Sequence, residues 1–231
     1  MFDMFYYDPT YILVILGFVL ASFASMGVQS TFKKYSDVKS YRHYTGADAA
    51  RKILDDNGLY NISIEHIHGD LNDHYDPRAN VIRLSDATYN SDSVAAIGVA
   101  AHEAGHAVQH AVGYAPIKVR NAIVPAVNIC SQISMPLFIL GLLIGAAGLA
   151  NLGIILFSAA LVFQLVTLPV EFNASRRAIK ILNSSAMLDE IELKGAKSVL
   201  RAAAMTYVAA VLASALQLLR LILINNSRRR D

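Results

Sequence analysis

The chain alternates between long apolar runs and one long polar segment. Apolar residues fill 10–28, and similar runs cover 121–149, 151–170 and 202–224. A helix crosses the hydrocarbon core of a bilayer in about 20 residues, so each run is long enough to span it. The residues before the first run, "MFDMFYYDP", contain no Lys or Arg, unlike the basic start of a secretory signal. The pattern predicts an uncleaved anchor and about four transmembrane helices.

Two features refine the later runs. The uncharged stretch "GLANLG" joins the second and third runs, which predicts a turn and a transmembrane hairpin over 121–170. The fourth run carries Arg220 near its end, and a charge inside a span is unfavourable unless it is partnered. Segment 201–231 is therefore predicted to be a membrane helix with a basic tail, and a helix lying along the interface is the alternative.

Basic residues predict the orientation, because loops rich in Lys and Arg stay in the cytoplasm. The basic residues nearest the ends of the first three runs are Lys33, Lys34, Lys39, Arg42, Lys118, Arg120, Arg176, Arg177 and Lys180. Residues 29–120 and 171–200 are thus expected in the cytoplasm, and 1–9 outside. The tail "NNSRRRD" disagrees, because a fourth crossing would place its arginines, Arg228, Arg229 and Arg230, outside.

The polar segment 29–120 predicts a small α+β domain. "GADAARKILDDNGL" (46–59) has apolar residues at helical spacing and a glycine at its end. "YNISIEHIH" (60–68) and "NVIRLS" (80–85) are typical of short strands. The second of these could serve as an edge strand that aligns an extended peptide by backbone hydrogen bonds. The fold class expected is a mainly α membrane protein with a small zincin-like cytoplasmic domain.

Two further stretches complete this domain. "DHYDP" (73–77), which contains Tyr75, predicts a compact polar turn that could face a cleft. "SDSVAAIGVAAHEAGHAVQHAVG" (91–113) opens with residues that cap helices, lacks proline and ends at a glycine. It predicts a long helix, cytoplasmic like the strands before it.

Composition narrows the class of protein. The chain has 231 residues, is 55% hydrophobic and carries a net charge of only +2. No stripe of basic residues with interleaved aromatics is present, which argues against nucleic-acid binding. The single cysteine, Cys130, excludes an intramolecular disulfide and a metal cluster built from cysteines.

The long helix carries a pattern with metal chemistry. His102, Glu103 and His106 form H-E-x-x-H, and residues four apart share one helical face, so both imidazoles can reach one ion. Zn²⁺ lowers the pKa of a bound water toward about 7, and Glu103 could accept its proton. The competing interpretation is a packed helix with satisfied polar side chains. That interpretation must account for ionisable groups on a buried helix, where they are unfavourable unless paired or bound to metal.

A catalytic zinc site needs a third protein ligand and an open position. Glu171 is best placed, because it follows directly on the third run and an unpaired carboxylate there would be unfavourable. The alternative is an interfacial carboxylate paired with Arg176 or Arg177. His110 lies one turn beyond His106, and it is expected to support the site or the packing rather than to bind the ion.

These segments resemble a known family. "HYDPRANVIRLS", "SVAAIGVAAHEAGHAVQH" and "LPVEFNASRRA" occur here in the order found in the YugP-like neutral zinc metallopeptidases of bacterial membranes. The resemblance implies zinc ligands at His102, His106 and Glu171, with Glu103 as general base. It extends over nearly the whole chain.

The family is distantly similar to gluzincin-type membrane proteases, in which E-x-x-x-D follows H-E-x-x-H. Here Ser175 stands where those proteases have the aspartate, so Asn173 or Ser175 could take its place beside the zinc histidines. Arg176 or Arg177 could stabilise the oxyanion, or could be a positively charged membrane anchor.

The function expected is that of a membrane-bound zinc metalloendopeptidase of the bacterial cytoplasmic membrane, with its active site at the cytoplasmic surface. Peptides or membrane proteins near the bilayer are the expected substrates. Four spans are few for a closed chamber, so membrane-protein partners or a homo-oligomer could complete the surroundings. The alternative is a membrane scaffold or partner subunit in which zinc is structural or absent.

Overall fold

The structure, a computed structural model, describes residues 8–227; most of the predicted external segment and the three arginines of the tail lie outside the described residues. The chain is mainly helical, and four helices are long and apolar enough to cross a membrane, as predicted. These helices are α1 (Tyr11–Ser36), α4 (Ala115–Leu143), α5 (Ala147–Ser184) and α6 (Glu190–Ser227).

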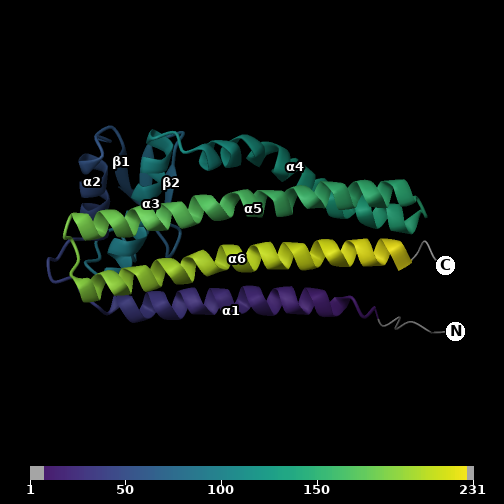
Figure 1. Ribbon diagram of the computed structural model, residues 1–231, viewed down its shortest axis with the longest axis horizontal. Coiled ribbons are helices and arrows are strands. Elements are labelled where there is room, and N and C mark those ends of the chain that lie inside the picture. The colour runs from purple at the N-terminus through teal and green to yellow at the C-terminus, as the bar shows by residue number, and fades with distance from the viewer. Residues whose placement is uncertain (1–7, 228–231) are drawn as a thin grey trace.

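The four long helices lie side by side along the long axis (Figure 1). Their neighbours follow the order α4, α5, α6, α1. The remaining elements gather at one end, and the N-terminal end of α1 and the C-terminal end of α6 lie at the other. Helix α6 runs antiparallel to α1 beside it, which favours the crossing over a helix along the interface.

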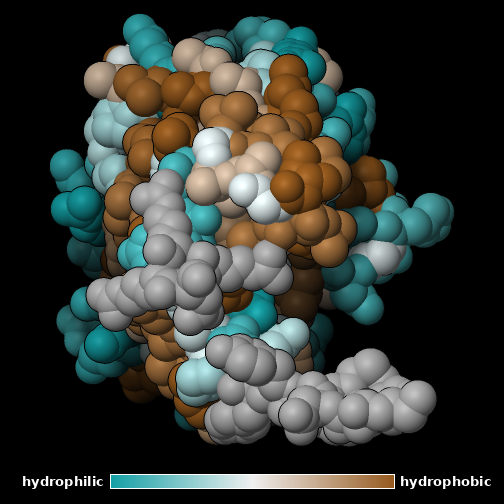
Figure 2. All heavy atoms as spheres, turned by 90° about the vertical axis from the view of Figure 1, so that its right-hand side faces the viewer, coloured by the Kyte–Doolittle hydropathy of each residue, from teal (hydrophilic) through white to brown (hydrophobic). Residues whose placement is uncertain are grey.

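These helices expose most of their apolar surface. Only 6% of the most apolar window of α1 is buried, and Phe18 and Phe23 are 71% and 67% exposed. Hydrophobic residues also occupy much of the face seen from the end opposite the sheet (Figure 2). Apolar surface of this extent is unfavourable in water, so it indicates a lipid environment.

The hairpin turns earlier than predicted. α4 ends at Leu143 and α5 begins at Ala147, so "GLANLG" (148–153) lies inside α5 and is not the turn. Gly145 makes the turn with a φ of 69°, which suits glycine at a helix end. Gly153 serves close packing instead, since a Cβ there would lie 2.7 Å from the Phe138 nitrogen of α4. Glycine is favoured both at turns and at close helix contacts, so a stretch of small residues does not distinguish the two.

Arg220 is partnered within the bundle. Its Nη2 lies 3.4 Å from Asp8 Oδ2, and its guanidinium stacks 4.3 Å from the centroid of the Tyr11 ring. The charge inside the fourth apolar run is therefore paired, as is required for an ionisable group inside a span.

The elements at the sheet end are α2 (Gly46–Asp56), β1 (Ser63–His66), β2 (His74–Asp76), β3 (Val81–Leu84) and α3 (Val94–Ala111). The sheet has the order β1-β3-β2, with β1 parallel and β2 antiparallel to β3.

Two predictions are wrong here. The stretch 73–77 is largely strand β2 and not a turn, because a strand of three residues is too short to show an alternating pattern. β3 is the central strand and not an edge, so β2 is the edge strand on that side. Alternation predicts a strand but not its neighbours in the sheet.

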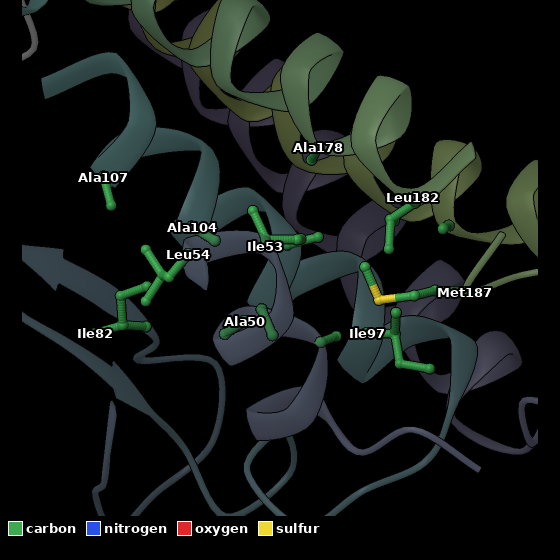
Figure 3. Packing of buried hydrophobic residues seen from close by; sticks show 14 of the residues in the cluster. Ala50, Ile53, Leu54, Ile82, Ile97, Ala104, Ala107, Ala178, Leu182 and Met187 are labelled. Atoms are coloured by element: carbon green, nitrogen blue, oxygen red, sulfur yellow. The ribbon is translucent and has the colours of Figure 1, made fainter. Parts of the chain in front are cut away.

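Helix α3 lies in the middle of the main core (Figure 3). Side chains from α2, α5 and β3 pack around it, among them Ile53, Leu54, Ile82 and Leu182. The helix begins where Ser93 Oγ accepts a hydrogen bond from the Ala96 nitrogen at 3.2 Å, a standard N-cap. This packing fixes the helix that carries the histidine pair.

Candidate metal centre

A close helix crossing brings the candidate ligands together. α3 passes α5 at Gly105, where a Cβ would lie only 2.8 Å from the carbonyl oxygen of Ala174. The backbones can approach this closely only because position 105 has no side chain. Glu171 lies one turn before Ala174 on α5, which places its carboxylate against His102 and His106.

The three side chains form a compact donor group. His102 Nε2 lies 3.1 Å from His106 Nε2, and Glu171 Oε2 lies 3.3 Å and 3.4 Å from these two atoms. Ligands of a tetrahedral zinc ion, at about 2.0–2.1 Å from the metal, are separated by about 3.3 Å. The spacing and the His₂Glu chemistry therefore fit Zn²⁺. Within residues 8–227, these three are the group that could hold a metal ion.

Outer hydrogen bonds orient both imidazoles. His106 Nδ1 donates to Gln109 Oε1 at 3.0 Å, and Gln109 Nε2 donates to the Val170 carbonyl at 2.8 Å. Ser175 Oγ lies 3.2 Å from His102 Nδ1. With Nδ1 protonated in each ring, both Nε2 lone pairs face the donor group, as in zinc sites whose histidines have such partners.

Glu103 lies beside this group and is largely buried. Its Oε2 accepts a hydrogen bond from the backbone nitrogen of Tyr75 at 2.9 Å, so the backbone of β2 orients the carboxylate. Burial raises the pKa of Glu103 above its ordinary value, and the nearby His102 and His106 oppose that rise only in part. A carboxyl group with a raised pKa is suited to accepting a proton near neutral pH.

Several predicted side chains lie elsewhere. His110 is exposed, and its ring lies 6.2 Å from that of Tyr75. Arg176 is exposed and donates to a carbonyl of its own helix. Arg177 donates to Asn173 Oδ1 at 2.7 Å, and Asn173 also accepts from Gln109. Asn173 thus acts through Gln109, and neither arginine contacts the donor group.

Sequence reasoning missed three residues at this site. Arg120 Nη1 lies 3.5 Å from Glu171 Oε1, whereas the sequence suggested Arg176 or Arg177 as its partner. Tyr207, from α6, lines both cavities at this site together with Glu171. Gln109 follows His106 by three residues and lies on the same helical face, and this spacing could have identified it as a hydrogen-bond partner of His106. Tyr207 lies in an apolar run, where no local pattern distinguishes it.

Two cavities open onto the donor group from different sides. One, of about 200 Å³, lies between α1, α3 and α6 and is walled mainly by apolar side chains. The other, of about 210 Å³, is bounded by β2 and α4 and includes His74, Arg120 and Asn121. Both reach Glu103 and Tyr207. The donor group is therefore accessible to a small ligand.

These features define a class: a protein with membrane-length helices and a His₂Glu metal centre at one end of them. The chain belongs to the family described as "Putative neutral zinc metallopeptidase", whose model matches residues 10–226. It is 49% identical over 212 residues to "Putative membrane protease YugP" of Bacillus subtilis (strain 168), covering 92% of this chain and 94% of that protein. The resemblance stated from the sequence is confirmed. No solved structure matches the chain.

Proposed function

We propose that the protein is a membrane-bound zinc metalloendopeptidase that hydrolyses peptide bonds at the cytoplasmic surface of the bacterial cytoplasmic membrane. The observation that carries the proposal is the donor group itself. Three ligands at tetrahedral spacing stand beside a buried carboxylate and open onto two cavities. A structural zinc site has four protein ligands and no open position, so this arrangement argues against the scaffold alternative.

Each residue has a distinct role in the proposal. His102, His106 and Glu171 hold the zinc ion, which when bound supplies Lewis acidity and lowers the pKa of a water molecule. Glu103 accepts the proton of the attacking water at its carboxylate and passes it to the leaving amine. Its hydrogen bond from Tyr75 keeps the carboxylate aimed at the site.

Tyr207, and not Arg176 or Arg177, is the proposed stabiliser of the oxyanion. Its side chain lines both cavities together with Glu171, so its hydroxyl is placed to donate to the carbonyl oxygen of the peptide as negative charge develops there. Arg120 pairs with Glu171 and adds positive charge to the same cavity.

The proposed orientation puts the site in the cytoplasm. Lys33 and Lys34 lie in the last turn of α1, and Lys118 and Arg120 lie in the first turns of α4. Both ends are at the sheet end of the molecule (Figure 1). The positive-inside rule then assigns that end to the cytoplasm, next to the bilayer.

The test is hydrolysis and metal content of the purified full chain in detergent or liposomes. Glu103→Gln should retain zinc and lose about 10²–10⁴-fold in peptide hydrolysis, because the proton acceptor is gone. Glu190→Gln, at an exposed position, is the matched control and should retain both. Cleavage by Glu103→Gln at the normal rate would refute the mechanism. A protein that binds no zinc would favour the scaffold.

A further inference from the structure

The mainly apolar cavity beside the donor group is lined by residues of α1, α3, α5 and α6 and of the loop before β2. Val28 and Phe32 come from α1, Val99 from α3, and Val199, Ala203 and Ala204 from α6. His102, Glu103 and Glu171 form its inner end. The cavity thus begins at the donor group and extends between two membrane-length helices.

The two sides of the donor group differ in chemistry. Away from the donor group, the cavity toward α1 and α6 is lined mainly by apolar side chains, with Asp73 shared by both cavities, whereas the one toward β2 and α4 presents His74, Arg120 and Asn121. Successive side chains of an extended peptide point to opposite sides. A peptide bond held over the donor group therefore directs one flanking side chain toward each cavity.

We propose that the apolar cavity is a specificity pocket, which holds a large apolar side chain of the residue on one side of the bond that is cut. This inference rests on the proposed function and names its substrate class: segments in which a Leu-, Met- or Phe-like residue borders the scissile bond. Burying that side chain removes apolar surface from water, and small residues leave the pocket poorly filled.

The position of the pocket adds a second element of selection. Its lining residues on α1 and α6 belong to the halves of these helices nearer the sheet, and Figure 1 shows that end of the bundle. Val28 is the last residue of the first predicted span (10–28). The pocket is therefore expected at the depth of the membrane surface, where that span ends. Substrates with apolar residues at the edge of the bilayer are placed to enter it.

The test changes the volume of the pocket. Ala203→Phe should fill it, and Ala202→Phe is the matched control, because Ala202 is the neighbour on α6 and does not line the cavity. Full-length variants are incubated with a mixture of peptides, and the cleavage sites are read by mass spectrometry. The wild type should favour Leu, Met or Phe on one side of the cut by at least about 10-fold over Ala or Gly, since one methylene in such a pocket is worth about 10–200-fold.

Ala203→Phe should abolish or reverse that preference, and Ala202→Phe should keep it. Phe32→Ala is a second variant in case Ala203→Phe does not fold; it enlarges the pocket and should extend the preference toward larger aromatic residues. An unchanged preference in both pocket variants, an equal change in the control, or a wild type without preference would each overturn the pocket.

A binding measurement separates this inference from the proposed function. Affinities of Leu- and Gly-containing forms of one peptide are measured on zinc-loaded Glu103→Gln, with and without Ala203→Phe. The pocket predicts tighter binding of the Leu form, lost with Ala203→Phe. If the wild type cleaves nothing but this difference is found, the hydrolase proposal fails and the pocket stands. Equal binding of both forms overturns the pocket even where cleavage occurs.

Discussion

Helix α5 makes two close crossings, and they serve different purposes. Near its start it packs on α4 at Gly153, where a Cβ would lie 2.7 Å from the Phe138 nitrogen. Further along it packs on α3 at Gly105, where a Cβ would lie 2.8 Å from the Ala174 oxygen. The first contact joins two apolar helices, as small residues do in membranes. The second places a carboxylate against two imidazoles.

The same kind of close helix contact holds a candidate metal centre at one crossing and not at the other. Both crossings depend on a glycine that lets backbones approach. The second brings ionisable and amide side chains together: Glu171, Asn173 and Ser175 on α5, opposite His102 and Gln109 on α3. Because α5 is one helix from Ala147 to Ser184, the hairpin and the donor group share a single element. Substitutions at the two crossings should therefore separate stability from metal binding.

Among the substitutions that test this comparison, the largest effect is expected from Tyr207, the α6 side chain that lines both cavities at the donor group. Tyr207→Phe should lower kcat by about 10²–10³-fold, the usual consequence of losing one donor to a developing oxyanion, with zinc content unchanged. Tyr114→Phe is the control, because its hydroxyl contacts the carbonyl of Pro169 on α5 and lies outside both cavities. Steady-state kinetics measures both. A Tyr207→Phe enzyme with full kcat would remove this residue from the mechanism.

The next effect concerns the crossing at the donor group. Gly105→Ala should reduce hydrolysis by about 10²-fold, because α5 must move and misplacement of a catalytic group by about 1 Å has this effect. Gly98→Ala on the same helix is the control, since its Cβ would meet Ala196 at 3.4 Å, an ordinary contact. Activity and zinc content are measured together. Equal losses in the two variants would show that α3 tolerates no added methyl group anywhere, and that the crossing is not special.

A smaller effect is expected from the amide that orients His106. Gln109→Leu should weaken zinc affinity by about 10–100-fold, as removal of an outer partner of a metal ligand does. At the end of the bundle opposite the sheet, Asn225 Nδ2 donates to Asn151 Oδ1 at 2.7 Å, and Asn225→Leu removes a comparable buried amide. That variant should bind zinc normally. Competition with a chromophoric chelator measures the zinc affinity of both variants. Weakened zinc binding in Asn225→Leu would show that packing far from the donor group also controls metal binding.

The sequence was sufficient for features that depend on local pattern. Apolar runs predicted four membrane-length helices, and an i, i+4 histidine pair predicted donors on one helical face. Features that depend on tertiary contact were not predictable in this way. The turn at Gly145, the place of β3 in the sheet and the position of Tyr207 in the cavities beside Glu171 all require knowledge of which elements become neighbours.

The third candidate ligand, Glu171, was predictable only in part from the sequence. Position and charge suggested Glu171 but left pairing with Arg176 or Arg177 open, and the family resemblance favoured the metal. In the structure Glu171 faces both histidines and Arg120, while Arg176 turns to its own helix. Residues five or six positions after Glu171 cannot be assigned as partners from sequence alone, because the tertiary neighbours of an ionisable group compete with those on its own helix.

The smallest effect on the site is expected from the hairpin crossing, and it tests the comparison most directly. Gly153→Ala should lower the free energy of unfolding by about 1–3 kcal/mol, the usual range for overpacking, because its Cβ would meet the Phe138 backbone and side chain. Gly148→Ala is the control, since nothing lies within 4 Å of its added Cβ. Thermal unfolding and zinc titration are measured in the same detergent. Zinc affinity should stay at the wild-type value in both variants, because the donor group lies at the other end of α5. A loss of affinity in Gly153→Ala alone would show that the hairpin sets the position of Glu171, and that the two crossings act as one unit.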